Sequence, residues 1–164
     1  MCSSDLLASS GYGQGEVLVT PLQMATIAAT IANGGELIAP RLVDRIGPPG
    51  SEGTAIDGRS LGRVLDASVA AAIGEAMRRA VEGPYAAALA GGAAIPGVPT
   101  AGKSGSAELG PGEEPHSWFV GFAPADAPRI AIAVVVEHGG YGADRAVPLA
   151  GRLLRAWWRA EDAG

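Results

Sequence analysis

Three strand-like runs in the second half of the chain limit its fold more than any other feature. They are Thr100–Glu108, Ser117–Ala123 and Arg129–Glu137, and the breaks between them are Gly110–Pro115 and Pro124–Pro128. Such short connections permit antiparallel neighbours, whereas a parallel crossover needs about a dozen residues or more. The sequence therefore predicts a three-stranded antiparallel meander.

Helices are predicted on both sides of this meander. Thr20-Pro21-Leu22-Gln23 indicates a helix start, because threonine can cap, proline suits the first helical position and glutamine completes a capping box. Asn33-Gly34-Gly35 ends that helix. A second helix is expected from about Asp66 to Gly83, and a third over Arg145–Glu161. The order helix, helix, three strands, helix is an α+β arrangement in which the last helix is free to cover the sheet.

Two further expectations concern the region around the second helix. Residues 36–46 are predicted to be extended, and residues 48–60 to form a loop rich in Pro and Gly. The second helix carries an apolar stripe with a spacing of four residues, which predicts a core-facing side and no functional face. The stripe consists of Val69, Ile73, Met77 and Val81.

Composition excludes several classes of function. The net charge of -5, with 12 basic against 17 acidic residues, argues against a nucleic-acid surface. Cys2 is the only cysteine, and only His116 and His138 offer imidazoles, so we expect no metal site and no cofactor. The chain as given shows no membrane-spanning stretch and no export signal.

The segment Gly97–Ser106, GVPTAGKSGS, fits two different motifs. Gly97, Gly102, Lys103 and Ser104 match the phosphate-loop pattern G-x-x-x-x-G-K-[ST]. That loop needs a buried strand before it and a helix after it, but the preceding residues are Ala- and Gly-rich and the following ones cannot begin a helix. A nucleotide-binding loop is therefore the remote alternative. The other motif is Lys103-Ser104-Gly105, which is close to the K-T-G triplet of penicillin-recognising serine enzymes.

Four blocks in one order carry a wider resemblance. They are Gly13–Ala25, Ile31–Gly35 followed by Pro40–Val43, Thr100–Glu108 and His116–Pro124. Together they resemble penicillin-binding-protein transpeptidase domains, more the monofunctional class B type than the bifunctional type. The resemblance implies an α+β fold, the C-terminal part of a penicillin-binding-protein and serine β-lactamase-like transpeptidase, with three strands of an antiparallel sheet packed with helices.

The resemblance also divides the chain. Residues 11–162 are expected to form the C-terminal part of a single transpeptidase domain. Residues 1–10 have no pattern that connects to the rest, and we expect a non-native or disordered start there.

Two motifs of the family are absent. The family's nucleophile lies in Ser-x-x-Lys and its second motif is Ser-x-Asn, but Lys103 is the only lysine and Asn33 the only asparagine here. Thr100 and Ile31 stand where those motifs would require serine. The resemblance therefore implies a fragment of a peptidoglycan D,D-transpeptidase that is inactive alone. A non-catalytic binding module, or pseudoenzyme, is the alternative.

The resemblance assigns roles along the strand that contains Lys103. Lys103, Ser104, Gly105 and Ser106 would belong to the catalytic site, and Lys103 with the hydroxyls of Ser104 and Ser106 would hold a substrate carboxylate. Gly105 would let an acyl group approach the backbone, and the Ser106 N–H would serve the oxyanion hole. Glu108 would lie at the edge of the substrate site, or be a solvated charge at the strand end.

The implied partners follow from the family. They are a peptidoglycan stem peptide of the D-Ala-D-Ala type, β-lactams and other cell-wall synthesis proteins, in cell division or the maintenance of cell shape. The parent protein is expected to be anchored at the outer face of a bacterial cytoplasmic membrane.

Overall fold

A computed structural model describes residues 3–15 and 17–162. Its helices are α1 (Ser3–Ser10), α2 (Pro21–Ala32), α3 (Ala67–Glu82) and α4 (Ala146–Asp162), with 3-10 turns η1 (Ala86–Ala88) and η2 (Gly91–Ala93). Its strands are β1 (Glu36–Ile38), β2 (Arg45–Ile46), β3 (Thr54–Ala55), β4 (Ser60–Arg63), β5 (Ala101–Ala107), β6 (His116–Ala123) and β7 (Ile130–Val136). None of the described helices combines the length and apolarity needed to span a bilayer.

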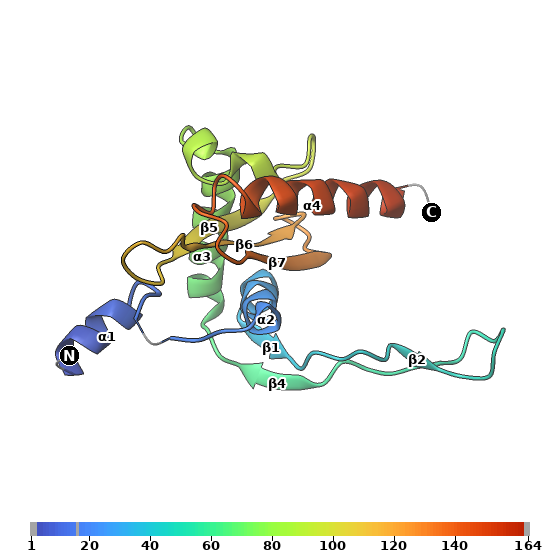
Figure 1. The fold of residues 1–164 in the computed structure, drawn as a ribbon. Helices are drawn as coiled ribbons and strands as arrows, with labels where there is room; N and C mark the ends of the chain where they lie inside the picture. Colours follow the sequence, from blue (N-terminus) through green and yellow to red (C-terminus); the bar gives the residue numbers. More distant parts are fainter. Residues whose placement is uncertain (1–2, 16, 163–164) are drawn as a thin grey trace.

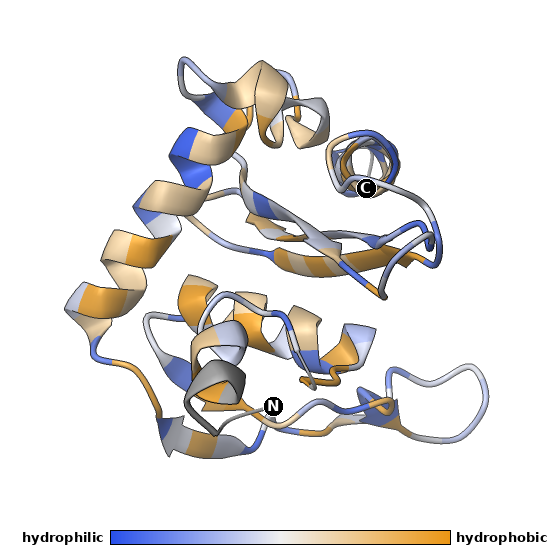
Figure 2. Cartoon of the chain, turned by 60° about the vertical axis from the view of Figure 1, so that its left-hand side comes forward, coloured by the Kyte–Doolittle hydropathy of each residue, from blue (hydrophilic) through white to orange (hydrophobic). Residues whose placement is uncertain are grey.

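The predicted meander is confirmed. Strands β5, β6 and β7 form one sheet in that order, and both pairs are antiparallel. Figure 2 shows the sheet as the middle layer, with α4 on one side and α2 on the other. We call the side under α4 the closed face and the side toward α2 and α3 the open face.

The closed face holds the main core. Phe119 and Val134 of the sheet pack with Val147, Ala150 and Leu154 of α4, and all five are buried. The Phe119 ring lies over Gly102 so closely that a Cβ at Gly102 would overlap it. Packing against Phe119 therefore explains why glycine stands at position 102, immediately before Lys103.

The start of α2 follows the predicted local chemistry. Thr20 caps α2: its Oγ1 accepts the Gln23 N–H at 3.2 Å, and the Gln23 Oε1 accepts the Thr20 N–H at 2.8 Å. Asp66 is the N-cap residue of α3, and Pro148 lies in the first turn of α4. Residues 3–10, which the sequence set apart from the domain, form α1.

The loop predicted for residues 48–60 is wrong in part. That stretch contains β3, which pairs with β2, and Ser60 begins β4, which pairs with β1. In Figure 1 these short strands form an arm that extends away from the sheet. Strands of two to four exposed residues have no alternation of apolar and polar side chains, so pattern analysis cannot detect them.

Candidate functional site

Four of the residues predicted for the site, Lys103 to Ser106, lie together on β5 at one edge of the sheet, and Glu108 follows directly after the strand. In the part of the chain that the structure describes, β5 pairs with β6 alone in the sheet order β5-β6-β7, so its outer edge faces away from the sheet. Lys103 is exposed, whereas Ser104, Gly105 and Ser106 are half-buried. The edge of a strand offers backbone N–H and C=O groups to an extended peptide, so this position suits peptide recognition.

Strand alternation places Lys103 and the two serine hydroxyls on opposite faces. Lys103 shares its side with Ala101, which packs with Met77 and Phe122 on the open face. Ser104 and Ser106 share the side of Gly102, under Phe119 on the closed face. A ligand that contacts both the ammonium and the hydroxyls must therefore lie across the edge of the strand.

The side chains of Lys103 and Ser106 each form a hydrogen bond with a backbone group. Lys103 Nζ donates to the carbonyl of its neighbour Ser104 at 2.8 Å, and Ser106 Oγ accepts the Gly142 N–H at 3.1 Å. Gly105 has room on its open side, because a Cβ there would meet only Trp118 Cβ, at 3.4 Å. The need for glycine at 105 is thus not explained by packing within this chain.

Gln14 contacts the same edge from far away in the sequence. Its Nε2 donates to the Ser106 carbonyl at 3.0 Å, and its Oε1 accepts the Glu108 N–H at 3.2 Å. The Glu108 side chain itself is exposed. The sequence placed Gln14 in a family block but gave no sign of a contact with β5.

A buried threonine fixes the start of β5. Thr100 Oγ1 donates to the Val98 carbonyl at 2.9 Å and accepts the Ile95 N–H at 3.3 Å. The Thr100 N–H donates to Glu82 Oε1 at 2.7 Å, which ties β5 to the end of α3. These contacts hold the strand that carries Lys103 against the helix.

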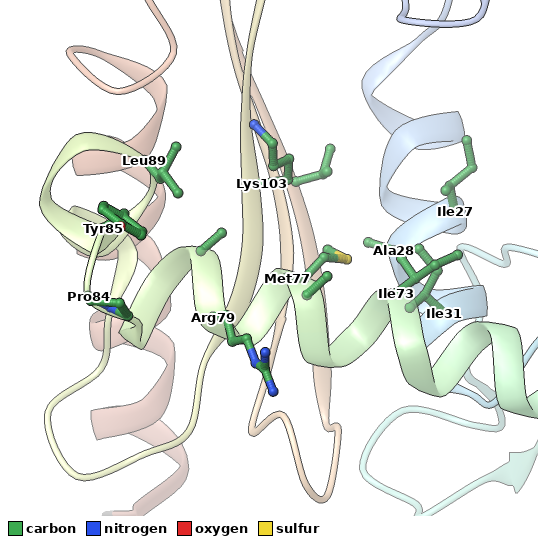
Figure 3. A pocket seen from close by; sticks show the side chains of 13 residues that line it. Ile27, Ala28, Ile31, Ile73, Met77, Arg79, Pro84, Tyr85, Leu89 and Lys103 are labelled. Atoms are coloured by element: carbon green, nitrogen blue, oxygen red, sulfur yellow. The ribbon is translucent and has the colours of Figure 1, made fainter.

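An apolar cavity of about 710 Å³ lies beside Lys103 on the open face. Figure 3 shows Lys103 between Leu89 and Tyr85 on one side and Met77 and Ile73 on the other. Ile27 also lines the cavity and is 49% exposed. Lys103 therefore lines a largely apolar space.

The cavity corrects the prediction for the apolar stripe of α3. Met77 and Val81 are buried as expected, but Ile73 is only partly buried and Val69 is 44% exposed. The stripe is a core face only along its second half. Its first half borders the open face.

The structure excludes a phosphate loop. Lys103 and Ser104 lie inside β5, and the chain continues into β6 and β7 rather than into a helix. Aligned N–H groups of a helix N-terminus are therefore missing at this position. Among residues 3–15 and 17–162, no group of three or more His, Cys, Asp or Glu side chains could hold a metal ion.

Comparison with known proteins identifies the family. Residues 3–155 match the penicillin binding protein transpeptidase domain. The chain belongs to this family. The predicted α+β transpeptidase fold is thereby confirmed, including its relation to the serine β-lactamases.

The relatives of this transpeptidase chain are much longer than it is. Peptidoglycan D,D-transpeptidase PbpA of Mycobacterium tuberculosis is 41% identical over 161 residues, which are 96% of this chain and 31% of that protein. Peptidoglycan D,D-transpeptidase MrdA of Haemophilus influenzae is 30% identical over 167 residues, covering 89% of this chain and 25% of that protein. The chain thus spans less than a third of either relative.

A solved relative has the same fold. Penicillin-binding protein A from M. tuberculosis, as a ceftriaxone acyl-enzyme complex, superimposes with a TM-score of 0.81 and 36% identity. The match covers 92% of this chain and 35% of that one. That relative therefore binds a β-lactam covalently.

Proposed function

We propose that this chain is part of a peptidoglycan D,D-transpeptidase that cross-links stem peptides through a serine acyl-enzyme and that also binds penicillin. The observation that carries the proposal is the exposed edge of β5 with Lys103-Ser104-Gly105-Ser106, in a chain that is 41% identical to a D,D-transpeptidase. The edge suits an extended peptide, and the cation suits a carboxylate.

In this proposal β5 supplies one wall of the active site. A stem peptide ending in D-Ala-D-Ala lies along the outer edge of the strand, and a β-lactam takes the same place. The Ser106 N–H donates to the carbonyl oxygen on which negative charge develops, and such donors typically contribute about 10²–10³ in rate. Lys103 and the hydroxyls of Ser104 and Ser106 contribute positive charge and hydrogen bonds around the edge of the strand.

The nucleophile is supplied from outside these 164 residues. Neither Ser-x-x-Lys nor Ser-x-Asn occurs in the sequence, and the relatives are more than three times as long. We therefore propose that the chain is inactive alone and acts within a longer protein. Because peptidoglycan lies outside the bacterial cytoplasmic membrane, that protein would act on the outer face of this membrane.

Labelling with fluorescent penicillin tests this proposal. The isolated 164-residue chain should form no covalent adduct that survives denaturing electrophoresis. A longer protein translated from the same reading frame, with Ser-x-x-Lys and Ser-x-Asn included, should label strongly. Robust labelling of the isolated chain would overturn the assignment of the nucleophile to another segment.

A non-catalytic binding module is the second candidate. One observation favours it: the substrate edge is intact although both serine motifs are absent from the sequence. The DNA upstream of the reading frame separates the two candidates. In-frame codons for both motifs support the enzyme, whereas a promoter upstream and the codon of Met1 as the start codon support the binding module.

A further inference from the structure

The Gln14 carboxamide occupies backbone groups at the outer edge of β5. It donates to the Ser106 carbonyl at 3.0 Å and accepts the Glu108 N–H at 3.2 Å. These two groups flank Ala107, and the N–H and C=O of one residue in a neighbouring parallel strand would bind them in the same way. Gln14 therefore mimics one residue of an added strand.

The same edge contains the N–H that would serve the oxyanion hole. In an antiparallel ladder, the N–H and C=O of one residue point to the same side, and alternate residues point to opposite sides. Since the Ser106 carbonyl points outward to Gln14, the Ser106 N–H also points outward. Both backbone groups of Ser106 are therefore available only to something on the outer edge.

A donor peptide that uses this N–H also needs the carbonyl that Gln14 holds. Two residues that form a hydrogen-bonded antiparallel pair exchange both N–H···O bonds. If the acyl-donor residue places its carbonyl at the Ser106 N–H, its own N–H is directed at the Ser106 carbonyl. That oxygen is the acceptor of Gln14 Nε2.

We propose that Gln14 competes with the acyl-donor residue for the Ser106 carbonyl, so that its carboxamide must leave this oxygen before an amide-bearing donor acylates the serine efficiently. The inference rests on the proposed transpeptidase function. Under this proposal Gln14 determines which donors react quickly. It acts through its hydrogen bond to the Ser106 carbonyl and does not touch the reacting atoms.

The surroundings of Gln14 allow this exchange. Its backbone N–H donates to the Ser9 carbonyl at 3.0 Å, so the loop position does not depend on the carboxamide. Its side chain is half-buried, at the surface of the edge. Rotation of the carboxamide into water would release the Ser106 carbonyl without moving the loop.

Two β-lactams with different substituents beside the reactive carbonyl test the competition. Penicillin G carries an acylamino N–H on that carbon, which can donate to the Ser106 carbonyl. Imipenem carries a hydroxyethyl group there and has no such N–H. Only penicillin G competes with Gln14 in the way proposed.

The experiment measures second-order acylation rate constants for both compounds, using the longer protein that contains the nucleophile. Gln14→Ala and Gln14→Met both remove the carboxamide, and Met keeps the side-chain length. Each should raise the rate constant for penicillin G by about threefold to tenfold, which is the effect of removing one competing hydrogen bond. The rate constant for imipenem should stay within about twofold.

The matched control is Leu18→Ala, on the same loop but with its side chain 92% exposed. It should leave both rate constants unchanged. A fall in the penicillin G rate, no change in it, or an equal change for both compounds in the Gln14 variants would overturn the inference. If neither compound acylates the unsubstituted longer protein, the proposed function fails and this inference fails with it.

Discussion

The two faces of the β5-β6-β7 sheet differ in how completely they are packed. On the closed face, Phe119 and Val134 meet Val147, Ala150 and Leu154 of α4 with almost no exposed surface. On the open face, the described residues that form the buried cluster are Met77, Ala101 and Phe122, and a cavity of about 710 Å³ lies next to it. The closed face is fully packed and buried, whereas the open face is only partly covered.

The position of Lys103 connects this difference with the proposed function. The residue lies on the open face and lines the cavity, while the closed face on the other side of the same strand holds β5 in place. A rigid scaffold behind a functional strand keeps its polar groups in position. Under the proposed function, the contrast places the Lys103 side chain on the open face and the packing that holds β5 on the closed face.

The largest expected effect is loss of packing on the closed face. Leu154→Ala should reduce the free energy of unfolding by about 3 kcal/mol, because the side chain is fully buried and its truncation leaves a cavity in the core. The matched control is Leu153→Ala, whose side chain is 48% exposed on the same helix, and it should cost less than about 1 kcal/mol. Urea unfolding followed by tryptophan fluorescence measures the unfolding free energy of both variants. Equal losses in the two variants would contradict a fully packed core on the closed face.

An intermediate effect is expected at the start of β5. Thr100→Val keeps the shape of the side chain but removes the hydroxyl that bonds to Ile95 N–H and the Val98 carbonyl. Since the site is buried, the variant should lose about 1–2 kcal/mol of unfolding free energy in the same assay. Stability equal to that of the unsubstituted chain would show that the hydroxyl does not hold the strand.

A smaller effect is expected on the open face. Ile73→Ala should cost only about 1 kcal/mol in the isolated chain, because Ile73 is partly buried and already borders the cavity. The comparison with Leu154→Ala is the sharper measurement, since both changes remove a similar volume of side chain. A loss as large as that of Leu154→Ala would mean that the two faces are packed alike.

The smallest effect is a pH dependence at the surface of α3. Hydrogen bonds from Arg78 and Arg79 lower the pKa of the Glu75 carboxyl from 4.5 to about 2. Because the pKa is lower in the folded state, this contribution is full above pH 4.5 and is lost as the pH falls toward 2. The melting temperatures of the unsubstituted chain and of Glu75→Gln should therefore converge over that interval. A difference that stays constant across it would exclude this contribution, which is small because the carboxyl is exposed.

Local features of the fold were predictable from the sequence. The capping box at Thr20 and Gln23 fixed the start of α2, and the breaks rich in Gly and Pro fixed the three strands of the sheet to within one residue or so. These signals depend on residues that are close together in the chain. The family resemblance then placed Lys103 to Ser106 on the strand where the structure has them.

Long-range features were not predictable in the same way. The bond from Gln14 to Ser106 joins residues 92 positions apart, and no local pattern marks it. The stripe on α3 looked like core throughout, because periodicity shows which residues share a face and not whether another element covers that face. Strand alternation could have shown that Lys103 and Ser104 lie on opposite sides, but their adjacency in one motif suggested a single cluster.

The central claim is that β5 provides the Lys103 wall of a transpeptidase site whose nucleophile lies elsewhere in a longer protein. The most direct measurement is intact-mass analysis of the longer protein after exposure to penicillin G. The test variant is Lys103→Ala, and the control is Arg152→Ala, which removes an exposed cation from α4. We expect one adduct per molecule in the unsubstituted protein and in Arg152→Ala, acylation about a hundredfold slower in Lys103→Ala, and no adduct on the isolated 164-residue chain. An unchanged rate in Lys103→Ala, or an adduct on the isolated chain, would contradict the claim.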